Sequence, residues 1–144
     1  MSHTTKIKSV PIRSVSAMRS AVAELKTMGI ACHLEENTIP RMYYNYQHKA
    51  CAYVLKMDDC KYDVGLDLQK DGTYAPVFDS WRGYVEKVLG SKYVTGKTKP
   101  IAKFLRAYTK AATIESAVEQ GYCVDSVTED ASGELTVTIS TGLM

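Results

Sequence analysis

Three short segments in the middle of the chain decide its fold class: CAYVLKM (51–57), KYDVGLDL (61–68) and TYAPVF (73–78). Each is rich in β-branched, aromatic and other apolar residues, and turn-forming residues separate them at 58–59 (DD) and 70–72 (KDG). Tight turns join antiparallel strands, whereas parallel strands need a crossover of a dozen or more residues. The three segments therefore predict an antiparallel meander.

The regions on both sides of this meander contain helical and strand-like patterns. Residues 14–29 begin with serines that can cap a helix, repeat apolar residues at helical spacing and end at Gly29. The apolar positions of this first helix are Met18, Ala21, Val22, Leu25 and Met28. Helices are also predicted from Asp79 or Ser80 to Leu89, with Trp81, Tyr84, Val85 and Val88 on one side, and over 101–119. Strands are expected over 3–12, 30–34, 122–129 and 134–140, and loops over 35–49 and 91–100. The predicted fold is a single α+β domain over residues 1–144, an antiparallel sheet with two or three helices packed on it.

Composition excludes several classes of protein. The chain has 144 residues, of which 45% are hydrophobic and 24% charged, which is typical of a globular domain and not of disordered, collagen-like or coiled-coil chains. It has no apolar run near the ~20 residues of a membrane span and no signal-peptide pattern. We therefore expect a soluble protein of the cytoplasm, or of the host cytoplasm if the protein is viral, with no membrane partner.

The cysteines indicate a reducing compartment and no metal site. No two of the four cysteines form a C-x-x-C pair; they are Cys32, Cys51, Cys60 and Cys123. His48 and Cys51 form a single H-x-x-C pair, whereas a structural zinc site usually has two short ligand pairs. Four reduced thiols are the simpler interpretation. The prediction is that the protein holds no metal and no cofactor.

Two near-motifs fail on spacing. Residues 95–98 (TGKT) imitate the end of a P-loop, but position 91, where that loop needs its first glycine, is Ser. Residues 67–72 imitate a calcium loop whose twelfth position is Phe78 instead of a bidentate Glu. No nucleophile, zinc-protease or dinucleotide motif is present in the sequence, so we predict a protein that is not an enzyme.

The net charge of +2 conceals separated blocks of charge. Residues 87–114 carry seven basic residues and no acid, while residues 115–144 carry six acids and no base. On the predicted helix over 101–119, Lys103, Arg106 and Lys110 lie on one stripe, and the opposite stripe of Ile101, Phe104, Leu105 and Ala112 is expected to face the core; Tyr108 could serve either role. Lys92, Tyr93, Lys97 and Lys99 precede this helix. A basic stripe beside an exposed ring is typical of a surface that follows a phosphate backbone. The acidic block could instead cover this stripe or meet a basic patch on a neighbouring copy or partner.

A second basic and aromatic segment lies in the long loop or arm predicted over 35–49. It reads RMYYNYQHK (41–49), so that Arg41 and Lys49 flank Tyr43, Tyr44 and Tyr46. Single-strand binders combine rings with cations in this way, because every base offers a π-face. The alternative is an arm whose tyrosines pack on the sheet or on another subunit.

Most of the chain resembles a known family. The blocks that carry the resemblance are MSHTTKIK (1–8), the helix ending at 25–29, YDVGL (62–66), DG-x-Y (71–74), DSW (79–81), FL-x-x-Y (104–108), QGY-x-V (120–124) and GEL (133–135). Their order resembles the Ycf-type family of small proteins from plastids, cyanobacteria, other bacteria and phages, which implies one α+β domain and no assigned activity. The arm over 35–49 departs from the family, and its usual DWW is here DSW. The size and the basic, aromatic character also resemble small single-stranded-DNA-binding cofactors of phage RNA polymerases.

These observations predict a non-enzymatic protein that binds single-stranded nucleic acid, most of all DNA. The resemblance to phage cofactors adds transcription regulation and recruitment of an RNA polymerase, and a homo-oligomer is expected. The alternative is a protein-interaction or assembly module that uses the tyrosine-rich arm and the charge blocks as a subunit interface. The predicted nucleic-acid-binding residues are Arg41, Tyr43, Tyr44, Tyr46, Lys49, Lys92, Tyr93, Lys97, Lys99, Lys103, Arg106 and Lys110.

Overall fold

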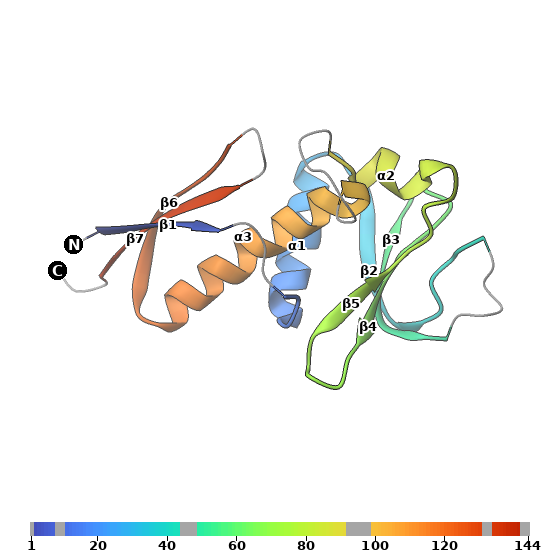
Figure 1. Ribbon diagram of the computed structural model, residues 1–144, viewed down its shortest axis with the longest axis horizontal. Helices are drawn as coiled ribbons and strands as arrows, with labels where there is room; N and C mark the ends of the chain where they lie inside the picture. The colour runs from blue at the N-terminus through green and yellow to red at the C-terminus, as the bar shows by residue number, and fades with distance from the viewer. Residues whose placement is uncertain (1, 8–10, 44–48, 92–98, 131–133, 142–144) are drawn as a thin grey trace.

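The computed structural model of the chain describes residues 2–7, 11–43, 49–91, 99–130 and 134–141. In chain order the elements are β1 (Ser2–Ile7), α1 (Val15–Thr27), β2 (Cys32–Thr38), β3 (Cys51–Met57), β4 (Val64–Leu68), β5 (Tyr74–Val77), the 3₁₀ turn η1 (Trp81–Gly83), α2 (Tyr84–Leu89), the 3₁₀ turn η2 (Lys99–Ile101), α3 (Ala102–Glu119), β6 (Tyr122–Glu129) and β7 (Leu135–Thr141) (Figure 1). Every strand pair among them is antiparallel. The predicted α+β class is confirmed. No helix in the described part of the chain combines the length and apolar character needed to cross a bilayer.

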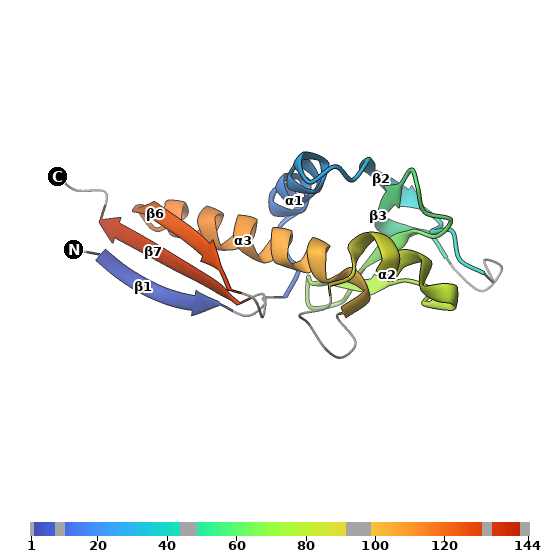
Figure 2. The same ribbon diagram turned by 90° about the horizontal axis from the view of Figure 1, so that it is seen from above.

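The strands form two antiparallel sheets where the sequence suggested one. The larger sheet has the order β2-β3-β4-β5, and the smaller sheet has the order β1-β7-β6. The smaller sheet arises because the first strand pairs with the last, from Ser2 opposite Ser140 to Ile7 opposite Leu135. Figure 2 shows the sheets at opposite ends of an elongated molecule, with α3 running from one to the other and both termini beside the smaller sheet.

The meander predicted from residues 51–78 is present as β3, β4 and β5. The turn between β4 and β5 places Gly72 at a φ of 87°, a left-handed conformation that favours glycine. The Asp71 carboxylate closes this turn by accepting hydrogen bonds from the backbone N–H and the hydroxyl of Thr73 at 3.0 and 2.6 Å. These two bonds lower the pKa of Asp71. The segment that imitates a calcium loop is thus a hairpin turn.

The strand β2 continues to Thr38, into residues that the sequence suggested were loop. Glu35 and Glu36 pair opposite Val54 and Tyr53 of β3, and the regular strand is disturbed at Asn37, whose φ is 50°. The prediction of a loop from residue 35 is therefore wrong for these residues. Charged residues are common on edge strands, where they discourage further pairing, so polar composition concealed the strand.

The main core lies between the larger sheet and the helices α1, α2 and α3. The predicted apolar face of α1 is buried at Ala17, Met18, Ala21, Val22 and Leu25, and Ser14 caps the helix by accepting from the Ala17 N–H at 3.1 Å. On α3, Phe104 and Tyr108 are fully buried. The Tyr108 hydroxyl accepts from the backbone N–H groups of Arg13 and Ser14 at 2.8 and 3.0 Å, which ties α3 to the start of α1.

A carboxylate reinforces this junction. Ser14 and Ser16 both donate their hydroxyls to Glu115 of α3, the first at 2.6 Å. These hydroxyl contacts, with Ser14 the larger cause, lower the pKa of Glu115. The two helices are therefore held in register by polar contacts at the edge of the core as well as by packing.

Candidate nucleic-acid interface

Half of the predicted binding residues lie outside the part of the chain whose side chains the structure describes. These are Tyr44, Tyr46, Lys92, Tyr93, Lys97 and the side chain of Lys99, whose backbone begins η2. The described ones are Arg41, Tyr43, Lys49, Lys103, Arg106 and Lys110. Lys49 is exposed two residues before β3 begins.

Arg41 has a strong partner within the chain. Its guanidinium donates to the Asp63 carboxylate, with Nη2 to Oδ1 at 2.7 Å and Nε to Oδ1 at 3.0 Å, and its backbone N–H donates to Oδ2 at 2.7 Å. Nη2 also donates to the carbonyl of Cys60 at 3.1 Å. The Asp63 side chain is fully buried whereas that of Arg41 is 48% exposed. The hydrogen bonds to Asp63 raise the pKa of Arg41. Arg41 therefore anchors the base of the arm to the sheet.

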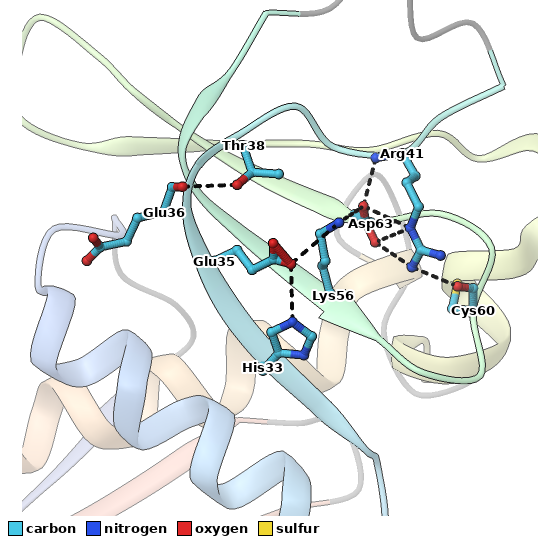
Figure 3. Close-up of polar contacts among 8 residues, drawn as sticks. All are labelled: His33, Glu35, Glu36, Thr38, Arg41, Lys56, Cys60 and Asp63. Carbon is cyan, nitrogen blue, oxygen red and sulfur yellow. Dashed lines mark hydrogen bonds and ion pairs between the residues drawn. The ribbon is translucent and has the colours of Figure 1, made fainter.

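The Arg41–Asp63 pair belongs to a row of alternating charges. Lys56 of β3 lies 3.8 Å from Asp63 and 3.5 Å from Glu35, and Glu35 lies 3.2 Å from the ring of His33. Figure 3 shows Asp63 between Arg41 and Lys56, with Glu35 and His33 continuing the row along β2. Opposite charges alternate along the row, so its cations are balanced by neighbouring acids. In the described part of the chain no three His, Cys, Asp or Glu residues are grouped to hold a metal ion.

The cations of the predicted α3 stripe also have partners in the protein. Lys110 forms an ion pair with Glu24 of α1 at 2.9 Å, and Lys103 donates to the Val88 carbonyl at 3.3 Å. Arg106 contacts Glu129 of β6 at 3.1 Å and donates to the Ser91 hydroxyl at 3.0 Å. One acid of the C-terminal block therefore covers the centre of this stripe.

Tyr43 belongs to an exposed aromatic pair that the sequence did not predict. Its ring lies 5.3 Å from that of Trp81, and the two residues are 53% and 49% exposed. The guanidinium of Arg82 lies 5.9 Å from the centre of the Trp81 ring, within cation–π range. Asp79 holds the pair together, because one carboxylate oxygen accepts from the Tyr43 N–H at 2.9 Å and the other from the Trp81 N–H at 2.8 Å.

A second ring pair lies beside the first. Tyr62 and Tyr84 meet edge to face with centroids 5.3 Å apart, and the ammonium groups of Lys61 and Lys87 lie 5.5 and 5.7 Å from the Tyr84 ring. The pKa of Tyr62 is raised, chiefly by burial and then by Asp79, Tyr84 and Tyr43. Tyr62 of the second pair therefore lies near Tyr43 and Asp79 of the first. We name this set the aromatic–cation patch: Tyr43, Lys61, Tyr62, Trp81, Arg82, Tyr84 and Lys87.

The local backbone explains why sequence reasoning missed Trp81. The helix expected from Asp79 or Ser80 begins only at Tyr84, and Trp81 lies in the preceding 3₁₀ turn η1. Arg82 and Gly83 both have left-handed backbones, with φ of 54° and 65°, and a helix cannot continue through them. Trp81 is exposed, and the prediction that it lies on one side of a helix with Tyr84, Val85 and Val88 is wrong. A tryptophan followed by Arg and Gly was the signal that could have indicated a turn.

Comparisons of the chain with protein-family models, with curated proteins and with solved structures found no significant match. The resemblance to the Ycf-type family stays a prediction.

Proposed function

We propose that the protein binds single-stranded nucleic acid at the aromatic–cation patch. The observation that carries the proposal is the exposed Tyr43–Trp81 pair, with Arg82 beside it and with Lys61 and Lys87 over the neighbouring Tyr84. Exposed rings provide faces on which unpaired bases stack, and the adjacent cations attract the phosphates between those bases. Bases in a duplex are already stacked, so this chemistry favours single strands over double strands.

The chain offers a direct test of this proposal. Trp81 is its single tryptophan, so tryptophan fluorescence, excited at a wavelength where the ten tyrosines absorb little, reports on the patch. Titration with a short unlabelled oligothymidine is expected to quench this fluorescence at low salt, and added salt is expected to weaken binding because phosphate contacts release counterions. A labelled strand followed by fluorescence anisotropy gives the affinity independently. Absence of both signals at low salt would refute the proposal.

Replacing Trp81 by Ala is expected to weaken single-strand binding by about 1–3 kcal/mol, roughly 5- to 150-fold, which is the contribution of one stacked base. Trp81→Phe keeps an aromatic face and is expected to retain most of the affinity. Anisotropy measures both variants, since neither keeps the intrinsic reporter. As a control, Leu68→Ala removes an exposed apolar side chain at the end of β4 and is expected to bind as the parent does. Equal affinities for the parent and Trp81→Ala would show that the strand binds elsewhere on the protein.

Asp79 is predicted to act as a positioning residue for the ring pair. Loss of its carboxylate in Asp79→Ala removes the two hydrogen bonds that hold Tyr43 and Trp81 together, and we expect about three-fold weaker binding or more. The direction of the change in affinity distinguishes a positioning role from a charge effect, because removing a negative charge by itself strengthens binding of an anionic ligand. Asp79→Asn keeps one acceptor oxygen and is expected to be intermediate. Asp59→Ala, an exposed acid in the turn before β4, is the matched control and is expected to leave affinity unchanged or slightly increased. If Asp79→Ala instead binds more tightly, Asp79 has no positioning role.

An assembly module is the competing proposal, because exposed aromatic pairs are also common at protein interfaces. Light scattering on the free protein distinguishes the two. A concentration-dependent oligomer that Trp81→Ala disrupts, without strand binding, would favour assembly. Preference for DNA, recruitment of an RNA polymerase, homo-oligomerisation and location in the cytoplasm stay predictions from the sequence.

A further inference from the structure

The stripe of cations on α3 borders a small hollow beside α1 and β6. The hollow has a volume of about 110 Å³, and its charged lining consists of Lys103, Arg106 and Lys110 together with Glu24 and Glu129. We name these five residues the α3 hollow. Three cations against two carboxylates leave one positive charge uncompensated within the set.

The contacts of Arg106 are incomplete. Glu129 reaches only Nη1, Ser91 receives a hydrogen bond from Nη2, and Nε is buried with no hydrogen-bond partner among the described residues. A guanidinium N–H binds carboxylate and phosphate oxygens alike. A phosphate in the place of Glu129 presents more acceptor oxygens than a carboxylate, and Lys103 and Lys110 line the same hollow.

Glu129 is also able to leave. Its side chain is 39% exposed, whereas that of Arg106 is 19% exposed. A partly exposed ion pair contributes little free energy, because water and salt solvate the freed carboxylate. Moving Glu129 into solvent would uncover Arg106, which is less exposed than Lys110, at small cost.

The α3 hollow lies beside the element that carries part of the aromatic–cation patch. Lys103 donates to the Val88 carbonyl, and Val88 follows Lys87 of the patch in α2. Both views show the start of α3 next to α2 (Figures 1 and 2). A strand that stacks on the patch and follows α2 would therefore reach Lys103 first, then Arg106 and Lys110, which succeed one another along one face of α3.

We propose that the α3 hollow is a second phosphate site for the same strand, and that Glu129 is its built-in competitor. This proposal rests on the function proposed above. A backbone phosphate displaces Glu129 from Nη1 of Arg106, takes its place there and is flanked by Lys103 and Lys110. Glu24 remains on Lys110 as the counter-charge from α1. The internal carboxylate keeps the site closed to weak anions and lowers the affinity for a strand.

Neutralising the competitor is the test. Glu129→Gln is expected to bind the labelled oligothymidine roughly five-fold more tightly at low salt, the effect of removing one partly exposed ion-pair partner. Glu119 is an exposed acid at the C-terminal end of α3. Glu119→Gln makes the same charge change as Glu129→Gln and is expected to raise affinity by much less. Equal gains in the two variants would show a general charge effect and overturn the proposal.

A second substitution ties the gain to the hollow. Adding Lys110→Gln or Arg106→Gln to Glu129→Gln is expected to abolish the gain, and Lys110, which is more exposed, serves if the Arg106 variant does not fold. Trp81 fluorescence separates the two proposals. Quenching of Trp81 with no change of affinity in Glu129→Gln overturns the second site alone. Absence of quenching and of binding in every variant overturns the proposed function.

Discussion

Phe104→Ala is expected to lower the free energy of unfolding by about 3–5 kcal/mol, the usual cost of truncating a large buried aromatic side chain. Phe104 lies on α3 with no exposed surface, in the core that α1, α2 and the larger sheet share with α3. Truncation removes its contacts and leaves a cavity, because neighbours on several elements can relax only partly. A loss of this size is a large share of the 5–15 kcal/mol that stabilises a typical domain.

Urea denaturation followed by circular dichroism measures this loss. Val118→Ala is the matched control on the same helix, since Val118 is 59% exposed and its truncation is expected to change stability by less than about 0.5 kcal/mol. Trp81 fluorescence provides a second probe from the larger-sheet end of the molecule. The two probes are expected to report one transition in the parent protein, because α3 contributes to both ends of the fold. A loss below about 1 kcal/mol in Phe104→Ala would contradict the packing described for α3.

The parts of the fold that the sequence predicted correctly are those set by local patterns. The residues of β3, the serine cap and apolar face of α1, and the extent and apolar face of α3 follow from spacing, turn residues and serine capping within a few residues. The split into two sheets does not, because it depends on β1 pairing with β7 at the far end of the chain. No local signal distinguishes a first strand that pairs with the meander from one that pairs with the last hairpin. The strand predicted over 30–34 ends before the observed β2 for a related reason. The glutamates that continue β2 are stabilised by Arg19 and Lys56, which lie on other elements.

The candidate site shows the same division. The sequence pointed to rings and cations as the relevant chemistry, and Tyr43 belongs to the patch. Trp81 and Arg82 were assigned to a helix, because the left-handed turn at Arg82 has no sequence signature stronger than the following glycine. The charge of a residue was readable from sequence, but its partner was not. Arg41 and Arg106 each pair with an acid more than twenty residues away, and only the fold brings those acids into contact.

Arg41→Ala is expected to lower the free energy of unfolding by about 3 kcal/mol, because it leaves the carboxylate of Asp63 buried without its guanidinium partner. Asp63→Ala is expected to cost less, about 2 kcal/mol, although it removes the same ion pair. The difference follows from exposure. Asp63 has no contact with water, whereas Arg41 is 48% exposed and its guanidinium can be hydrated once the carboxylate is gone. Asp67→Ala, on β4, the strand that begins directly after Asp63, is the charge-matched control and is expected to cost about 0.5 kcal/mol or less.

A double-mutant cycle over Arg41 and Asp63 makes the test complete. The double variant is expected to be no less stable than Arg41→Ala, since it removes the buried carboxylate that has lost its guanidinium partner, and the coupling energy is expected to reach about 2 kcal/mol or more. The same variants bear on binding, because the backbone N–H of Arg41 is held by Asp63 two residues before Tyr43 of the patch. If Arg41 acts only as an anchor, Arg41→Ala and Asp63→Ala weaken strand binding to similar extents. If Arg41 also contacts phosphate, Arg41→Ala weakens binding more and alone flattens the salt dependence, by a slope of about 0.7 for one lost contact. Anisotropy at several salt concentrations, on variants shown by denaturation to be folded, separates the two roles.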